Sequence, residues 1–253
     1  MDSRLIEPGS QVRLIVDAPA LGCWNMAVDE VLLESAAAGI TTLRFYQWQE
    51  PTLSLGYFQS LEDREQHPAS CNCPVVRRSS GGGAIVHDHE LTYSFSCPVQ
   101  GLDTQHFYQE LHHSLCSALA HFHVKAELWQ ADPGSIQGTP FLCFQRRSPG
   151  DMVTRDVKIA GSAQRRKRGA LLQHGSVLLG TSHHAPELSS IGTELGIELP
   201  FDELVGQWCQ ILTERWGIKF RASKLGEPEI GRVEELESEK FANIDWTRRH
   251  IRS

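Results

Sequence analysis

The chain has 253 residues, 40% hydrophobic and 22% charged, a composition typical of a globular protein that can bury a core without disulfides or a structural metal. It has no apolar run long enough for a membrane-spanning helix, and a formal net charge of −7 argues against a general binder of nucleic acid or anionic membranes. The first residues lack the pattern of a secretory signal, so we expect a cytoplasmic protein whose seven cysteines are reduced.

The hydrophobic pattern predicts more strands than helices. In chain order, we expect a strand at 12–16, a helix at 25–38, strands at 41–48, 52–56, 84–87 and 91–97, a helix at 105–122, strands at 125–129, 157–163 and 171–179, and a helix at 201–216. Several strands follow one another directly, which favours the α+β class, with central mixed or antiparallel sheets flanked by helices. We expect one catalytic domain over residues 1–253, with a core at about 12–220 and a Glu-rich helical segment or tail at about 221–253.

Charge is distributed unevenly along the chain. The segment Arg146–Arg168 holds eight basic and two acidic residues, a local charge of +6, so the rest of the chain carries −13. Glu227–Glu239 holds six glutamates and one arginine. Such a basic run is either a solvated face or a docking patch for an acidic partner, and the sequence leaves both open.

A run of three glycines, Gly81–Gly83, follows Arg77-Arg78-Ser79-Ser80 between two predicted strands. Consecutive glycines let backbone N–H groups approach a carbonyl, phosphate or oxyanion, and the arginines offer charge-assisted hydrogen bonds to the same group. The run matches neither a Walker loop nor a G-x-G-x-x-G that opens a helix. The alternative interpretation is a flexible hairpin turn.

Histidine and cysteine pairs raise the question of a metal site. Strand alternation would place His87 and His89 on one face, and Cys71 and Cys73 are similarly spaced. No second pair stands at zinc-finger spacing and no H-E-x-x-H is present, so we expect ordinary polar residues and no metal. We interpret His112-His113 as helix or loop surface.

Lys158 begins a stretch of small residues, Ala160–Ala163, which leaves room beside the backbone for a ligand. A lysine partly removed from water in such a cleft can lower the pKa of a neighbouring thiol or act as a base. Cys143 lies fifteen residues earlier and is a candidate for that thiol. On spacing alone, Cys143 could equally be a buried and inert residue.

In combination, these motifs resemble the lipoate ligase and octanoyltransferase family, whose catalytic domain is related to that of biotin ligase. The matching stretches span about residues 12–180 in the family's order. They are Trp24–Glu30, Pro51–Gly56, Arg77–Asp88, Glu90–Ser94, Lys158–Arg166 and Leu172–Ser176. The resemblance implies a biotin/lipoate ligase-like catalytic domain, in which the glycine run lines an acyl tunnel, Lys158 sits opposite, and His174 and Gly175 close the wall. The substrate-binding residues it implies are Arg78, Gly81, Gly82, Gly83, His87, Gly161, Ser162, Ala163, His174 and Gly175.

The position of Cys143 decides which branch of the family the sequence favours. Its placement before Lys158 resembles that of the nucleophile in one octanoyltransferase group. That resemblance implies transfer of octanoyl from acyl carrier protein, through a Cys143 thioester, to a lysine of a lipoyl-domain protein such as the glycine cleavage H protein or a dehydrogenase E2 subunit. Lys158 would act as base and thiolate stabiliser, and no cofactor would be needed.

Three alternatives to octanoyl transfer stay open. An ATP-dependent lipoate–protein ligase acts through lipoyl-adenylate and needs ATP and Mg²⁺. Gly83 is more typical of that branch, and Gln145–Pro149 departs from the more familiar transferase pattern. The remaining alternatives are a lipoyl amidotransferase and a non-catalytic paralogue that binds carrier proteins.

Overall fold

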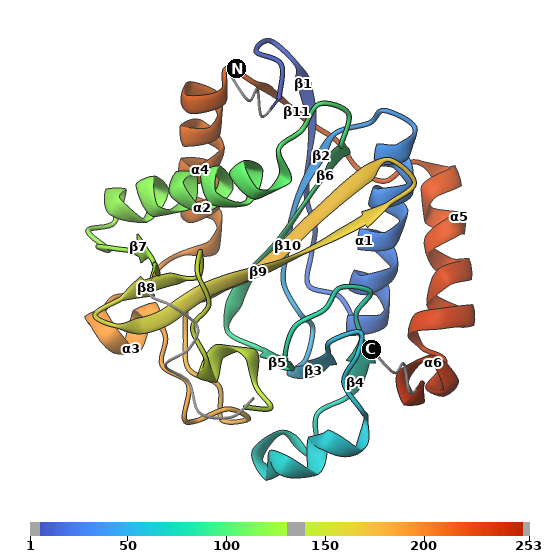
Figure 1. The fold of residues 1–253 in the computed structure, drawn as a ribbon, viewed down its shortest axis with the longest axis vertical. Helices are drawn as coiled ribbons and strands as arrows, with labels where there is room; N and C mark the ends of the chain where they lie inside the picture. The colour runs from blue at the N-terminus through green and yellow to red at the C-terminus, as the bar shows by residue number, and fades with distance from the viewer. Residues whose placement is uncertain (1–5, 131–139, 250–253) are drawn as a thin grey trace.

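A computed structural model describes residues 6–130 and 140–249. An eight-stranded mixed sheet, in the order β11-β1-β2-β6-β10-β9-β8-β7, crosses the molecule, and a three-stranded sheet, β4-β3-β5, lies beside one end of it (Figure 1). The strands are β1 (Gln11–Val16), β2 (Thr42–Tyr46), β3 (Thr52–Leu55), β4 (Val75–Arg77), β5 (Ile85–His87), β6 (Glu90–Pro98), β7 (Glu127–Leu128), β8 (Met152–Thr154), β9 (Val157–Lys167), β10 (Ala170–Leu178) and β11 (Lys219–Ala222).

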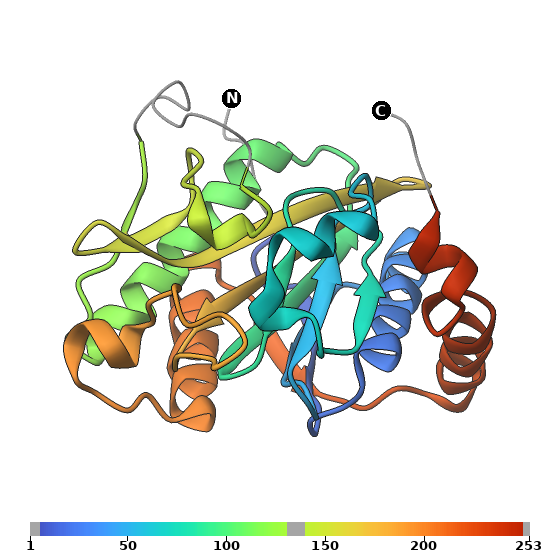
Figure 2. The ribbon, with the colours of Figure 1, turned by 90° about the horizontal axis from the view of Figure 1, so that it is seen from below.

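Helices cover both faces of the large sheet, as Figure 2 shows. They are α1 (Gly22–Ala37), α2 (Thr104–His121), α3 (Ile191–Leu195), α4 (Phe201–Trp216), α5 (Glu227–Leu236) and α6 (Ile244–Arg248). Helices α2 and α4 pack on one face, and α1 packs on the other with α5 outside it. The prediction of an α+β fold with mixed sheets flanked by helices is confirmed.

The centre of the sheet is built from antiparallel strands joined by tight turns. Strand β1 pairs in parallel with β2 and β11, whereas β6, β10, β9 and β8 pair antiparallel. Two-residue turns, Arg155-Asp156 and Arg168-Gly169, join β8 to β9 and β9 to β10, and all four residues have positive φ. Turns of this kind match the twist of the strands they join, so they fix the register of the long β9–β10 hairpin.

Helix α1 is a central layer rather than a surface helix. Eleven of its sixteen residues are buried, which is more than one apolar stripe would require. The sheet covers one side and the C-terminal segment covers the other through Val233, Leu236 and Phe241. The Glu-rich segment is therefore packed helix, and part of its charge is paired, as in the contact of Glu229 with Arg13 at 2.8 Å.

Most predicted elements are confirmed, with differences at the short ones. The strand expected at 125–129 shortens to the two residues of β7. Strands β4, β8 and β11 and helix α3 were not predicted, because three to five residues are too few to establish a hydrophobic period. Over the described residues, no helix has the length and apolar character needed to cross a membrane.

The core between the sheet and α4 is centred on Trp208, which is fully buried against Phe45 and Tyr93 and donates from Nε1 to Ser114 Oγ at 2.8 Å. We predict that Trp208→Ala lowers the free energy of unfolding by about 3–5 kcal/mol, because it leaves a cavity and removes the hydrogen bond to Ser114. Urea denaturation measures this. The matched control is Ile244→Ala, at a side chain that is 49% exposed, and it should cost at most about 0.5 kcal/mol. Equal losses in the two variants would contradict this picture of the core.

Candidate active site

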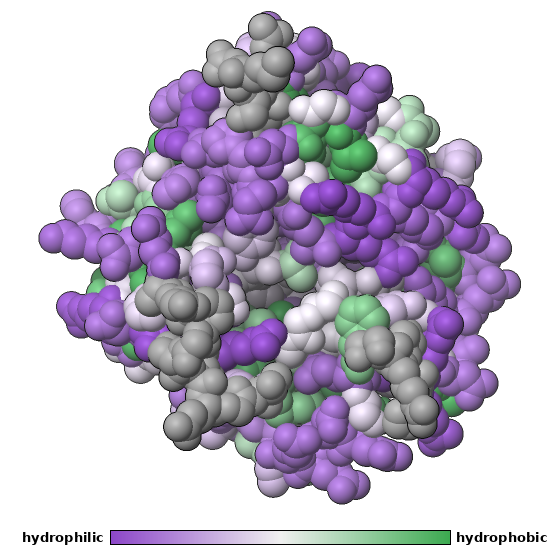
Figure 3. All heavy atoms as spheres, in the orientation of Figure 1, coloured by the Kyte–Doolittle hydropathy of each residue, from purple (hydrophilic) through white to green (hydrophobic). Residues whose placement is uncertain are grey.

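A cavity of about 130 Å³ lies between the glycine run, the segment after Leu142 and the β9–β10 hairpin. Figure 3 shows the surface hollowed near the centre of this view, beside small and weakly polar residues. The cavity brings together eleven of the twelve residues that the sequence singles out. They are Arg78, Gly81, Gly82, His87, Cys143, Lys158, Gly161, Ser162, Ala163, His174 and Gly175.

Gly83 is the twelfth, and it supports the cavity without lining it. A Cβ atom at Gly83 would lie 3.0 Å from the backbone N of Cys143, so the loop and the cysteine backbone are in close contact. The neighbouring residue Ala84 accepts a hydrogen bond from that same Cys143 N–H at 2.7 Å. The third glycine of the run therefore helps to position Cys143.

A β-bulge turns Lys158 into the cavity. Val153 pairs with Lys158, but Met152 pairs with Ala160, so Ile159 is an extra residue in β9. Simple alternation would place Lys158 on the same face as Ala160, in the core; the extra residue reverses its direction. A Cβ atom on Gly161 would lie 2.8 Å from Lys158 Cε, which shows that the lysine shares the face of Gly161 and that this position needs a glycine.

The lysine ammonium contacts both a carboxylate and the candidate thiol. Lys158 Nζ lies 2.8 Å from Asp151 Oδ2 and 3.7 Å from Cys143 Sγ, and it donates to the Cys143 carbonyl at 3.3 Å. Both charged side chains are buried, with 3% and 5% exposed. From the sequence alone, Asp151 has no predicted role beyond its charge, although an acidic residue inside a basic segment was a usable signal.

Four of the other six thiols are poorly suited to nucleophilic chemistry. Burial raises the pKa of Cys97, Cys116 and Cys209 to about 12, and burial with the nearby Glu237 carboxylate raises that of Cys23 to about 11. A thiol with so high a pKa stays protonated at neutral pH. Only Cys143 among the seven lines the cavity beside a lysine.

The buried Arg78 side chain holds the glycine run in place through hydrogen bonds to its carbonyls. Its guanidinium donates to Ser54 and to the carbonyls of Gly81 and Gly83, at 2.6–3.1 Å. Burial lowers its pKa to about 10, which still leaves it charged at neutral pH. Among the described residues, none accepts a hydrogen bond from the N–H groups of Gly81–Gly83. Arg78 therefore holds the loop so that its amides stay free for a ligand oxygen.

The two histidines considered as metal ligands do not meet. His87 is buried, stacks on Trp48 at 3.9 Å between ring centroids, and bonds Glu90 and Ser54 through its two nitrogens. The side chain of His89 is 64% exposed. The prediction that both share a face is wrong because β5 ends at His87, and alternation does not continue through the turn.

His112 is a residue that the sequence misplaced. The expectation of a surface position is wrong, because the imidazole is fully buried and bonds Ser162 Oγ through Nε2 and the Gly150 carbonyl through Nδ1. Burial lowers its pKa to about 4, so it is neutral at physiological pH. It faces the sheet, where Ser162 on β9 contacts it, and helical periodicity alone did not reveal that contact.

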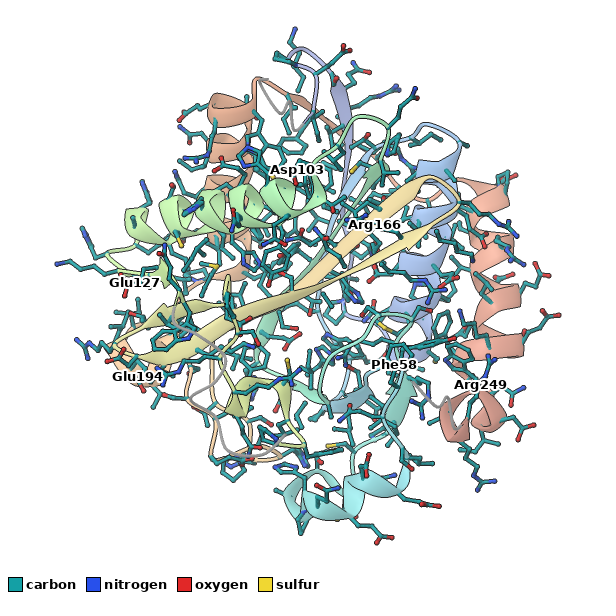
Figure 4. The ribbon with its side chains drawn as sticks, in the orientation of Figure 1. Phe58, Asp103, Glu127, Arg166, Glu194 and Arg249 are labelled. Atoms are coloured by element: carbon teal, nitrogen blue, oxygen red, sulfur yellow. The ribbon has the colours of Figure 1, made fainter. Side chains whose placement is uncertain are left out.

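The basic segment is divided between the two ends of β9. Figure 4 places Arg166 at one end of this strand and Glu194, whose carbonyl binds Arg155, at the other. Lys158 is buried between them, and Lys167 pairs with Glu30 at 2.6 Å. The +6 charge is therefore not one continuous patch. The exposed members of the hairpin end are Arg166 and Arg168.

Comparison with known proteins identifies the family. Residues 22–191 match the lipoyl protein ligase A/B catalytic domain, and the chain is 31% identical to octanoyltransferase LipM of Clostridioides difficile, over 95% of this chain and 99% of that one. The chain belongs to this family. Octanoyltransferase LipM of Oceanobacillus iheyensis is 38% identical over 64% of this chain, and the match spans 62% of that protein's length. The resemblance inferred from the motifs is confirmed, and these relatives bear the name of the branch that the sequence favours.

Solved structures of this lipoyl protein ligase A/B family share the fold. A putative lipoate protein ligase from T. acidophilum superposes with a TM-score of 0.78 and 22% identity, over 95% of this chain and 98% of that one. Lipoate-protein ligase A bound with ATP gives 0.77 and 21% identity, over 95% and 100%. At these identities, the likeness concerns the architecture alone.

The buried Lys158–Asp151 pair yields a stability prediction. Asp151→Asn should lower the free energy of unfolding by about 3–5 kcal/mol, because it leaves the ammonium buried without a counter-charge. The double variant Asp151→Leu/Lys158→Met should recover most of that loss in urea denaturation, since it removes both charges of the pair together. Asp156→Asn, at a side chain that is 86% exposed, is the control and should change little. A loss no larger than that of the control would show that the pair is not coupled.

Proposed function

We propose that this chain transfers octanoyl from acyl carrier protein to a lysine of a lipoyl domain, through a thioester on Cys143. The observation that carries the proposal is the Lys158 ammonium, buried 3.7 Å from the Cys143 sulfur in a cavity. A cation at this distance stabilises negative charge on the sulfur, and the attacking form of a cysteine is the thiolate. The names of the curated relatives support the same activity.

The chemistry needs no cofactor. Attack of the Cys143 thiolate on a carrier-bound thioester exchanges one thioester for another, which is nearly neutral in free energy, and the amide formed in the second step is more stable. The unbonded amides of Gly81–Gly83 are the natural donors to the oxyanion that forms in each step. Gly161 and Gly175 both line the cavity in which the acyl chain would lie. A Cβ atom on Gly175 would lie 2.6 Å from the Gly161 carbonyl, so the close approach of the two strands favours a glycine there.

The alternative is a lipoate–protein ligase, which would need ATP and Mg²⁺ and would release pyrophosphate. The solved structures that share the fold include such ligases, but a ligase has no use for a cysteine beside the lysine. A lipoyl amidotransferase would use Cys143 in the same way and differ only in taking its acyl group from another lipoyl domain. A non-catalytic paralogue would bind carriers without acylating Cys143.

The proposed partners are acyl carrier protein as donor and a lipoyl-domain protein, such as the glycine cleavage H protein or a dehydrogenase E2 subunit, as acceptor. Carriers of both kinds are typically acidic, which suits the exposed arginines of the β9–β10 turn. We expect the reaction in the cytoplasm, where thiols are kept reduced.

The first test is the covalent intermediate. Purified protein mixed with octanoyl–acyl carrier protein should gain the mass of one octanoyl group on Cys143 without ATP, measured by intact and peptide mass spectrometry. Cys143→Ala should gain none, and Lys158→Met should react on the order of a hundredfold more slowly. Failure of wild type to form the adduct, with pyrophosphate released from ATP and lipoate, would establish the ligase instead.

The second test concerns docking. Arg166→Glu/Arg168→Glu should lower kcat/KM with octanoyl–acyl carrier protein by about tenfold, because it reverses two exposed charges that meet an acidic carrier. Acylation by octanoyl-pantetheine, which has no protein surface, should be unchanged. Arg155→Glu, at the opposite end of β9, is the matched control and should leave both donors unaffected. Equal loss with both donors would refute docking at this turn.

A further inference from the structure

A serine, a histidine and an aspartate form a hydrogen-bonded chain beside the cavity, on the side of α1. Ser80 Oγ lies 2.5 Å from His174 Nε2, and His174 Nδ1 lies 3.0 Å from Asp29 Oδ2. His174 lines the cavity, and Ser80 directly precedes the two glycines that line it. A serine on one imidazole nitrogen and a carboxylate on the other is the arrangement in which histidine takes a proton from the serine side.

Asp29 is held as an ionised carboxylate, the form that accepts a hydrogen bond from His174. Its other oxygen accepts from Arg44 at 3.1 Å, and Tyr46 donates to the oxygen that faces His174. Burial opposes ionisation, but the hydrogen bond from His174 and the charge of Arg44 keep the pKa of Asp29 below its usual value. An ionised carboxylate can only accept, so His174 carries its proton on Nδ1 and presents the lone pair of Nε2 to Ser80.

The proposed second step needs a proton acceptor. The acceptor lysine arrives as an ammonium, since its pKa is about 10.4 in water, and an ammonium has no lone pair with which to attack. Lys158 is held by Asp151 at 2.8 Å and by the Cys143 carbonyl at 3.3 Å, a position that suits stabilisation of charge on the sulfur. The chain of Ser80, His174 and Asp29 offers a further place for the proton on another side of the cavity.

We propose that Ser80 and His174 receive the proton of the acceptor lysine, with Asp29 as the residue that positions His174. This inference rests on the proposed octanoyl transfer through Cys143 and assigns a further catalytic pair to its second half. The ligand recognised is a primary amine, presented next to the acyl-cysteine.

The second half-reaction begins with proton transfer from the acceptor lysine. The ammonium gives one proton to Ser80 Oγ as the Ser80 hydroxyl proton moves to His174 Nε2, which frees the nitrogen lone pair. The nitrogen then bonds to the acyl carbon, and collapse of the oxyanion breaks the bond between that carbon and the Cys143 sulfur. The sulfur leaves with the bonding electrons and takes up the second amine proton. His174 returns its proton to water.

Two other buried histidines lie nearby and are less suited to this role. His112 is fully buried behind Ser162, and its low pKa, about 4, makes it a weak base. His87 is stacked on Trp48, and the hydroxyl on its Nε2 belongs to Ser54, which is fully buried and bound to Arg78. Of these three buried histidines, His174 is the one that both lines the cavity and contacts Ser80, the residue before the glycine run.

The experiment separates the two half-reactions. Octanoyl-Cys143 is first formed on wild type, His174→Gln and Ser80→Ala and quantified by mass. Each acyl-enzyme is then mixed with a lipoyl domain or with hydroxylamine, whose nitrogen is mostly unprotonated at neutral pH. Both variants should form the acyl-enzyme normally, transfer octanoyl to the lipoyl-domain lysine about a hundredfold more slowly, and react with hydroxylamine at the wild-type rate.

A serine–histidine–carboxylate cluster away from the cavity, formed by Ser70, His67 and the exposed Glu187, provides the matched control. His67 contacts Ser70 at 2.8 Å and Glu187 at 2.7 Å and does not line the cavity, so His67→Gln should leave both rates unchanged. Equal slowing with the lysine and with hydroxylamine would show a merely structural role for His174 and overturn the inference, as would normal transfer by both variants. A wild-type protein that never acylates Cys143 would instead overturn the proposed function, and the inference with it.

Discussion

The burial of the Lys158 ammonium is the constraint around which the site is arranged. A buried cation costs several kcal/mol unless a counter-charge and hydrogen bonds compensate it, and Asp151 and the Cys143 carbonyl do so here. The same interactions fix the ammonium beside the Cys143 sulfur. Because the lysine side chain runs along β9, a Cβ atom at position 161 would displace the Lys158–Asp151 pair, which favours glycine there. The β-bulge at Ile159, the glycine at 161 and the buried Asp151 thus together hold a buried cation beside the thiol.

On the opposite wall of the cavity, helix α1 also carries buried charged side chains that are compensated by partners. Its neighbouring acidic residues point to different partners: Asp29 contacts His174, and Glu30 accepts from Ser79 at 2.7 Å. Burial of Glu30 is outweighed by Lys240, Lys167 and other donors, which lower its pKa to about 2. The residues before the glycine run are therefore linked to helix α1, Ser79 directly through Glu30 and Ser80 through His174 and Asp29. That helix is stable in this role because the C-terminal segment covers its outer side.

Much of the fold and of the site could be predicted, because their signals are local or contained in motifs. The long strands and the three long helices follow from periodicity, and the glycine run, Lys158 and Cys143 were identified by residue type and spacing. The sequence misassigned His112 and overlooked Asp151 because each depends on a partner far along the chain or across a bulge. It also treated the basic segment as one patch, since charge counted along the chain does not reveal the length of β9 that separates its ends.

The sequence by itself determined the class of fold, the family and the chemical groups available, because residue type and order are sufficient for these. Only the tertiary structure decided which groups meet. Alternation along β9 would have placed Lys158 in the core with Ala160, and one extra residue, Ile159, turned it toward Cys143 instead. Likewise, Asp29, Ser80 and His174 come from a helix, a loop and a strand that are distant in sequence. Direction and contact across elements depend on packing and register, which no local pattern encodes.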